Sequence, residues 1–317
     1  MVKKMKQFIY SLDNKRYHTL NYHLKTIYGC KVAKVSLNAG FTCPNRDGTK
    51  GYGGCTFCSS SGSGDFGGNM EDRLEIQFEN ISGIMRNKWP NCKYIAYFQA
   101  NTNTYGSVER IKKCIAPFID RKNVVGISIA TRADCLSDEI IEYLAEVSLK
   151  TDLWLEIGLQ SIHDQTATRI NRGHSYQEFL DGIARLRQRN IKVCVHIMNG
   201  LPYETLDMML ETAKVVGTLD IQALKIHMLY IIENTKLAND YKKQPFYILT
   251  REEYISLVAK QLAYIPPQVI IERLTGDGDV KNLIAPLWSI KKVTILNDID
   301  KEMRIKNIYQ GCKLQPK

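Results

Sequence analysis

Three cysteines lie close together in one segment of the sequence, CPNRDGTKGYGGCTFC, at residues 43–58. Cys43, Cys55 and Cys58 follow the spacing C-x11-C-x2-C. Thiolates at this spacing can ligate zinc, which normally takes four Cys or His ligands, so that a fourth would have to come from afar, such as Cys30 or Cys92. They can also hold an iron–sulfur cluster, and three thiolates leave one iron of a four-iron cluster open to another ligand. Both interpretations make the segment a metal site.

The residues between the cysteines favour metal ligation over free thiols. Gly51, Gly53 and Gly54 allow the backbone to fold closely around a bound group and to direct N–H groups at anionic sulfur. Such a loop offers little apolar surface that could bury unligated thiols. The other six cysteines lack this context and are expected to be small buried residues: Cys30, Cys92, Cys114, Cys135, Cys194 and Cys312.

The elements that must position these cysteines are visible as apolar runs. Six such runs, many of them rich in β-branched residues, predict buried strands at 32–37, 94–98, 124–129, 153–159, 193–198 and 224–229. Helical patterns lie between them, for example at 176–189, where Ser175 and Glu178 form a predicted capping box. Strands that alternate with helices predict an α/β fold of parallel βα units, either a barrel or an open doubly wound sheet.

Further polar residues follow the predicted strands or interrupt them. Gln99 and Asn101 come after the second strand, Arg132 comes after the third, and Gln160 follows the fourth. Glu156 lies inside the apolar run of the fourth strand, where a buried carboxylate needs a partner. In a barrel the chemistry takes place at the carboxyl ends of the strands, so these residues are expected to share a site with the cysteine loop.

Length, charge and cysteine number limit the class of protein. The chain has 317 residues, a net charge of +10 and nine cysteines, an odd number that argues against a fully paired disulfide framework. No stretch approaches the roughly 20 apolar residues of a membrane helix, and the N-terminal apolar run is too short for a signal peptide. A cytoplasmic protein with reduced thiols is expected. The positive charge suits a polyanionic partner, although a well-solvated basic enzyme would carry it too.

The cysteine loop follows the first predicted strand and ends in Cys-Thr-Phe-Cys. This arrangement resembles the radical S-adenosylmethionine (SAM) enzymes, whose usual spacing is C-x3-C-x2-C. The longer first gap resembles instead the catalytic subunit of Elongator and the bacterial YtqA/YhcC family. The resemblance covers most of residues 15–310, and its main stretches are YFQANTNTYG (97–106), ISIATRADCL (127–136), LEIGLQS (155–161), RINRGHS (169–175), HIMNGLPYET (196–205), KIHMLYIIENTKLA (225–238) and ERLTGDGDVKNLIAPLW (272–288).

The resemblance implies a fold and two cofactors. The fold is a partial (β/α)6 TIM-like barrel of the radical SAM type at residues 31–240. A basic N-terminal extension at 1–30 precedes it, and a C-terminal extension at 241–317 packs on it. The cofactors are a [4Fe–4S] cluster and SAM, from which an external electron generates a 5′-deoxyadenosyl radical.

The resemblance also implies which residues surround the cluster. Cys43, Cys55 and Cys58 ligate it and thereby take part in catalysis. Phe57 is the aromatic residue that lies near the adenine of SAM. Leu201, in the fifth-strand motif, shapes a surface for the same adenine.

Polar residues at the other strand ends have two interpretations each. Gln99 and Asn101 could bind the ammonium or carboxylate group of SAM, or could cap their own loop. Arg132 could pair with a SAM carboxylate or a substrate phosphate, or could form a structural salt bridge. Glu156 could bind the ribose hydroxyls of SAM or belong to a buried ion pair. Gln160 could contact the ribose or the substrate.

The implied substrate is the C5 side chain of the wobble uridine in tRNA, carried on the anticodon stem-loop. Because the sequence ends soon after the radical SAM segment, acetyl transfer is not expected. The implied reaction converts carboxymethylaminomethyluridine to aminomethyluridine, with a flavodoxin or ferredoxin as electron donor, before a tRNA methyltransferase acts. Two alternatives stay open: a radical SAM enzyme that acts on a small metabolite or cofactor precursor, and a non-catalytic, zinc-containing RNA-binding protein.

Overall fold

The computed structural model describes residue 8 and residues 14–62, 67–276 and 278–314. Residues 1–7 and 9–13 of the predicted N-terminal extension therefore lie outside the described residues. Its remaining part contains helix α1 (Leu20–Tyr28), which begins after the cap residue Thr19.

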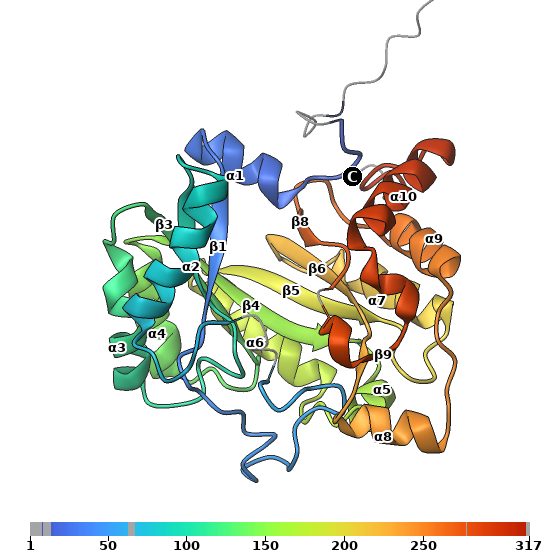
Figure 1. Ribbon diagram of the computed structural model, residues 1–317, viewed down its shortest axis with the longest axis horizontal. Coiled ribbons are helices and arrows are strands. Elements are labelled where there is room, and N and C mark those ends of the chain that lie inside the picture. The colour runs from blue at the N-terminus through green and yellow to red at the C-terminus, as the bar shows by residue number, and fades with distance from the viewer. Residues whose placement is uncertain (1–7, 9–13, 63–66, 277, 315–317) are drawn as a thin grey trace, which may run out of the picture.

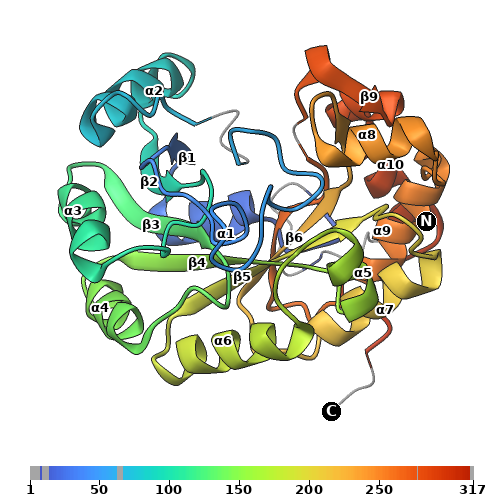
Figure 2. The same ribbon diagram turned by 90° about the horizontal axis from the view of Figure 1, so that it is seen from below.

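One parallel sheet organises the chain. Its strands follow each other in the order β1 (Val32–Leu37), β2 (Lys93–Phe98), β3 (Val124–Thr131), β4 (Asp152–Gln160), β5 (Lys192–Asn199), β6 (Ala223–Met228) and β8 (Ile270–Arg273). The sheet curves into a half-barrel with helices on its outer side (Figures 1 and 2). The order of the strands in the sheet follows the order of the chain throughout. In a doubly wound sheet this order would reverse at one point. The predicted partial barrel is confirmed, and the open alternative is wrong.

The sheet contains one strand more than the sequence predicts. Strand β8 pairs with β6 in parallel and comes from the segment predicted as a C-terminal extension. It is only four residues long, IIER, and its last two residues are charged, so it lacks the long apolar run of the other strands. The six predicted strands are confirmed, with ends within two residues of the prediction.

Helices cover the outer side of the sheet and bury the apolar core between the two layers. They are α2 (Leu74–Lys88), α3 (Val108–Ile119), α4 (Asp138–Ser148), α6 (Tyr176–Gln188), α7 (Leu206–Val216) and α9 (Arg251–Leu262), with α10 (Lys292–Ile305) packed against α9. Two shorter helices, α5 (Asp164–Arg169) and α8 (Lys236–Lys243), lie in the connections after β4 and β7. The predicted capping box of Ser175 and Glu178 at the start of α6 is confirmed. A small antiparallel pair, β7 (Ile231–Ile232) with β9 (Leu283–Ala285), lies beside the barrel after β6.

Charged side chains fill part of the inner side of the sheet. Glu156 on β4 accepts hydrogen bonds from Lys34 on β1, at 2.6 Å, and from Lys225 on β6. Lys34 also pairs with Glu272 on β8 at 2.6 Å. His196 on β5 lies 3.0 Å from the second oxygen of Glu156. This buried ion network connects the first strand of the half-barrel to the last.

The network keeps Glu156 ionised. Burial alone would raise the pKa of Glu156, but Lys225 and Lys34 hold it well below its usual range. Burial would lower the pKa values of Lys34 and Lys225, but the carboxylates of Glu156 and Glu272 raise them. All three side chains are therefore charged at neutral pH.

We expect Glu156→Gln to lower the free energy of unfolding by about 3 kcal/mol, because it leaves two lysines in the barrel interior with one carboxylate between them. Urea denaturation followed by circular dichroism measures this change. Glu139→Gln on the exposed face of α4 is the matched control and should change stability by less than about 0.5 kcal/mol. Equal stability of the two variants would contradict a structural role for the network.

Candidate functional site

The cysteine loop, residues 43–58, lies across the end of the half-barrel that the carboxyl ends of the strands form. Figure 2 shows the molecule from this end. The loop follows β1 and carries all three cysteines to the wall of one cavity of about 250 Å³, here called the inner cavity. Cys55 is buried, whereas Cys43 and Cys58 are partly exposed. The sequence prediction that these three residues share a site is consistent with this arrangement.

The RINRGHS segment between β4 and α6 holds the loop in place. The side-chain amide of Asn171 donates to the carbonyl of Gly54 at 2.8 Å, and the backbone N–H of Thr56 donates to the carbonyl of Ile170 at 2.9 Å. Gly53 and Gly54 have φ values of +77° and +79°, in the left-handed region that favours glycine. The loop therefore has a specific backbone path that depends on a distant part of the chain.

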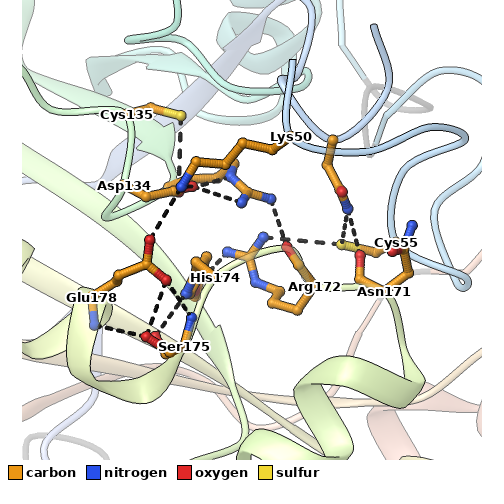
Figure 3. A network of polar contacts seen from close by, with 12 residues as sticks. Lys50, Cys55, Asp134, Cys135, Asn171, Arg172, His174, Ser175 and Glu178 are labelled. Carbon is orange, nitrogen blue, oxygen red and sulfur yellow. Dashed lines mark hydrogen bonds and ion pairs between the residues drawn. The ribbon is translucent and has the colours of Figure 1, made fainter. Parts of the chain in front are cut away.

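Arg172 makes a direct contact with a cysteine thiol (Figure 3). Its Nη1 donates to Sγ of Cys55 at 3.9 Å, and its Nη2 donates to the carbonyl of Gly158 at 2.5 Å. The neighbouring Cys58 thiol, followed by the positive charges of Arg172 and Arg132, lowers the pKa of Cys55 to about 5. Cys55 is thus a thiolate at neutral pH, the form that ligates iron.

A second layer of charges supports Arg172. Arg132 donates to the carbonyl of Arg172 at 2.7 Å and forms a two-pronged salt bridge with Asp134, both at 2.9 Å. Lys50, from the long gap between the first two cysteines, pairs with Asp134 at 2.8 Å and with Glu178 at 3.2 Å (Figure 3). The ion pairs of Lys50 tie the cysteine loop to the loop after β3 and to the start of α6.

For Arg132 and Glu156 the sequence left two interpretations open, a contact with SAM or a structural ion pair. The structure shows an ion pair for both. Arg132 forms the salt bridge with Asp134, and Glu156 belongs to the ion network of the barrel. Both also line the inner cavity, so a contact with SAM stays a prediction for each. Gln99 lines the same cavity and accepts a hydrogen bond from Ser36 at 3.1 Å.

Asn101 and Gln160 present unused polar atoms to the inner cavity. Both residues have positive φ, +57° and +68°, which non-glycine residues seldom adopt. Asn101 Oδ1 and Gln160 Oε1 are buried without a hydrogen-bond partner. A buried acceptor without a donor is costly, so these oxygens call for a ligand that donates hydrogen bonds. The ammonium and ribose hydroxyl groups of SAM are such donors.

Phe57 and Leu201, the two apolar residues predicted to lie near the adenine of SAM, have different surroundings. Phe57 lines the inner cavity together with Met198, as expected of a surface for adenine. Leu201 is buried in a small apolar cluster with Leu229 and Ile231, and it does not line that cavity. A contact of Leu201 with adenine stays a prediction, and the backbone of Leu201 would have to make it.

Free cysteines elsewhere differ in part from the prediction. Cys92 and Cys194 are buried, as expected, but the prediction is wrong for four that are only partly buried: Cys30, Cys114, Cys135 and Cys312. Among the residues that the structure describes, no three His, Cys, Asp or Glu side chains are arranged to hold a single metal ion. Cys43, Cys55 and Cys58 all line the inner cavity, so they could hold one bound group between them.

Sequence reasoning missed Arg172, Asn45 and Lys50 as parts of the site. Asn45 lies in the cysteine loop, and its side-chain amide reaches Sγ of Cys55 at 3.9 Å. Only their position in segments that resemble the radical SAM family could have indicated them. Lys50 and Arg172 contact residues more than 80 positions away, and the contact of Asn45 depends on how the cysteine loop folds.

Comparison with known proteins bears directly on this site. The model of the radical SAM superfamily matches residues 41–216, and the model of the radical SAM C-terminal domain matches residues 221–305. The chain belongs to the radical SAM superfamily. The radical SAM fold explains why the cysteine loop, the half-barrel and the inner cavity occur together, and membership implies a [4Fe–4S] cluster and SAM as cofactors.

Individual relatives place the chain within the superfamily. It is 50% identical over 304 residues to the uncharacterized protein YtqA of Bacillus subtilis, which covers 96% of this chain and 94% of YtqA. It is 26% identical over 191 residues to the tRNA uridine(34) acetyltransferase of Methanocaldococcus infernus, covering 59% of this chain and 35% of that protein. The resemblance to the YtqA/YhcC family is confirmed.

A solved structure shares the fold. The archaeal Elp3 of Methanocaldococcus infernus superposes with a TM-score of 0.66 at 19% identity, covering 89% of this chain and 64% of that one. This chain thus covers less than two thirds of the Elp3 chain. No helix in the described ranges is long and apolar enough to span a membrane.

The protein's own residues prepare the site for the two cofactors. A bound and reduced cluster would supply the electron with which SAM is cleaved to the radical. Cys43, Cys55 and Cys58 would hold the cluster, and Arg172 would keep the Cys55 sulfur in its anionic form. Asn101 and Gln160 would accept hydrogen bonds from SAM.

We expect Arg172→Met to lower the reduction potential of the cluster, because it removes a positive charge beside Cys55. The loss of a charge-assisted hydrogen bond of about 1.5 kcal/mol corresponds to roughly 65 mV for one electron. Redox titration of the reconstituted protein, followed by electron paramagnetic resonance, measures the shift. Arg172→Lys keeps the charge and should shift the potential less, and Arg185→Met on the outer side of the barrel should not shift it. A potential unchanged in Arg172→Met would disprove the tuning role.

Proposed function

We propose that this radical SAM enzyme modifies the C5 side chain of the wobble uridine in tRNA, converting carboxymethylaminomethyluridine to aminomethyluridine. The observation that carries the proposal is the similarity to the tRNA uridine(34) acetyltransferase, whose name gives the same nucleotide position, joined by the shared Elp3 fold. The net charge of +10 suits a polyanionic substrate. The zinc-binding alternative is dropped because the chain belongs to the radical SAM superfamily.

The chemistry begins with removal of a hydrogen atom from the CH2 group between the amine and the carboxylate of the substrate side chain. Both neighbours stabilise the carbon radical that results. Loss of one proton and of one electron, which a bound iron–sulfur cluster would accept, then gives an imine. Water hydrolyses the imine to the aminomethyl group and glyoxylate. The hydrogen atom and the electron together account for the two-electron oxidation of the side chain.

Two adjoining cavities could receive a base that is turned out of a tRNA loop. The inner cavity adjoins an outer cavity of about 660 Å³, lined by residues of β6, β7 and β9 and of the segment that precedes α10. A base turned out of a single-stranded loop needs such a pocket, and unstacked loop bases are the usual targets of enzymes that act on RNA.

The proposal includes the surroundings in which the enzyme acts. The substrate region is the anticodon stem-loop, and a flavodoxin or ferredoxin in the cytoplasm supplies the electron. The aminomethyl product carries a primary amine, so the enzyme acts before a tRNA methyltransferase that uses this amine.

Anaerobic turnover tests the proposal. The protein is reconstituted with iron and sulfide and reduced in the presence of SAM, with tRNA that carries carboxymethylaminomethyluridine. We expect 5′-deoxyadenosine to form and the digested tRNA to yield aminomethyluridine. Cys55→Ala is the control and should yield neither product, because the cluster loses a ligand.

Two other outcomes would point elsewhere. Formation of 5′-deoxyadenosine at the same rate with and without tRNA, and with an unchanged nucleoside, would favour a small metabolite or cofactor precursor as the substrate. Conversion of the nucleoside to a product other than aminomethyluridine would keep the tRNA substrate and overturn the reaction.

A further inference from the structure

An exposed tyrosine occupies the turn that follows β5, at the carboxyl end of the half-barrel. Tyr203 is 56% exposed, and its φ of +65° lies in the left-handed region of the backbone. A bulky residue seldom adopts this conformation, which costs free energy that burial of the ring could offset. Here most of the ring is exposed, so packing does not explain a tyrosine at this position. Residues held in such a conformation cluster at sites of ligand binding and catalysis.

A cation lies over the Tyr203 ring. The guanidinium carbon of Arg169, the last residue of α5, is 4.7 Å from the centre of the ring, within the roughly 6 Å of a cation–π contact. Nη1 of Arg169 also donates to the carbonyl of Pro202 at 3.4 Å. In the part of the chain that the structure describes, Arg169 forms no ion pair, and the nearby Glu204 accepts a hydrogen bond from Ser161. The exposed charge of Arg169 is therefore available to an anion.

Two further aromatic rings connect Tyr203 to the body of the protein. The ring of Phe246 lies 6.2 Å from that of Tyr203, and the ring of Tyr241 on α8 lies 5.1 Å from that of Phe246, centre to centre. Phe246 and Tyr241 are half-buried and pack against a small apolar cluster. We call Arg169, Tyr203 and Phe246 the aromatic surface.

The aromatic surface lies close to the two cavities. The apolar cluster on which Phe246 packs contains Leu229, which lines the outer cavity. Phe57 of the cysteine loop packs against the same cluster and lines both cavities. Figure 1 shows α5 and α8 at the lower end of the barrel, where the cysteine loop also lies. A molecule that reaches into the outer cavity can therefore contact the aromatic surface with its adjoining parts.

We propose that the aromatic surface binds an unpaired base of the tRNA anticodon loop while the wobble uridine enters the outer cavity. The inference rests on the proposed function and names the surface that holds its substrate. An exposed ring stacks on the face of any base, and an arginine beside the ring pairs with a phosphate of the same strand. The net charge of +10 complements such a strand. An unpaired nucleotide thus supplies both an apolar face for Tyr203 and an anion for Arg169.

The two contacts differ in their response to salt. A phosphate contact releases counterions from a single strand, so each one makes the logarithm of the affinity fall by about 0.7 per tenfold increase in salt. Stacking of a base on a ring releases no counterion. A variant that loses the stacked base should therefore bind more weakly at every salt concentration, whereas a variant that loses the phosphate contact should show a smaller salt dependence.

Binding without turnover tests the inference. The reconstituted protein, with SAM and without an electron donor, is titrated at several salt concentrations with an anticodon stem-loop RNA that carries carboxymethylaminomethyluridine. We expect Tyr203→Asn to weaken binding about tenfold at every salt concentration, because one stacked base corresponds to about that factor. Asparagine tolerates the left-handed backbone, so the melting temperature of this variant should stay within about 2 °C of that of the wild type.

Three further variants assign the contacts. Tyr203→Phe keeps the ring and should keep the affinity. Arg169→Gln should reduce the slope of log affinity against log salt by about 0.7. Lys214→Gln on α7 is its matched control, because the Lys214 ammonium also lies 4.7 Å from a tyrosine ring, that of Tyr264, but on the outer side of the sheet. This control should leave both the affinity and the slope unchanged.

A second RNA identifies the bound group. It has the same stem and wobble uridine, but the other nucleotides of its loop lack their bases. The wild type should bind this RNA about tenfold more weakly than the complete stem-loop. Tyr203→Asn should bind it as tightly as the wild type does, because the stacked base is then missing from the RNA as well as its partner from the protein.

The remaining outcomes overturn the inference. Unchanged affinity in Tyr203→Asn excludes the stacked base, and the proposed function stands without it if the wild type still converts tRNA. Normal RNA binding with slower cleavage of SAM when flavodoxin supplies the electron assigns the surface to the donor protein. If Tyr203→Asn is unstable, an unchanged salt slope in Arg169→Gln is decisive against the phosphate contact. A wild type that neither converts tRNA nor prefers the complete loop overturns both proposals.

Discussion

The contact between Glu156 and its two lysines is the constraint on which the half-barrel depends. Lys34 lies on the first strand and Lys225 on the sixth, and Glu272 on the last strand of the sheet completes the network. Backbone hydrogen bonds join only neighbouring strands, so they cannot hold the two edges of an open sheet at a set distance. The ion network does so across the interior. Buried ion pairs add little net stability relative to apolar packing, but a charge left without its partner is costly, and this favours one arrangement of the strands.

The same network determines where the core lies and where the ligands go. In a closed barrel of eight strands, branched apolar side chains fill the interior. Here the apolar core lies between the sheet and the outer helices, while the inner side carries Lys34, Glu156, His196 and Lys225. An interior lined by charged groups suits a polar ligand with several charges. The fold thus places its apolar core on the outer side of the sheet and its charged groups and inner cavity on the inner side.

The fold could be predicted from the sequence further than the site could. Long β-branched runs mark six strands, whereas the short, half-charged IIER gives no comparable signal for β8. The cysteine spacing indicates the ligands, because all three come from one loop. A carboxylate in an apolar run, as at Glu156, indicates that a partner exists. It does not indicate which one, since Lys34 is 122 positions away and meets Glu156 only after the sheet has formed. Arg172 and Lys50 escaped notice for the same reason.

The long gap between Cys43 and Cys55 has a physical explanation in these contacts. A loop without helix or strand must have its backbone polar groups satisfied by other parts of the chain. The additional residues bring Asn45 to Cys55 and Lys50 to Asp134 and Glu178, so that the loop is fastened to the segments after β3 and β4. Those segments also supply Arg172, which contacts the Cys55 thiol. The gap therefore does more than connect two ligands, because it couples the position of the cysteines to the end of β4, which bears Gln160. A cluster and SAM bound there would be held by one continuous set of contacts.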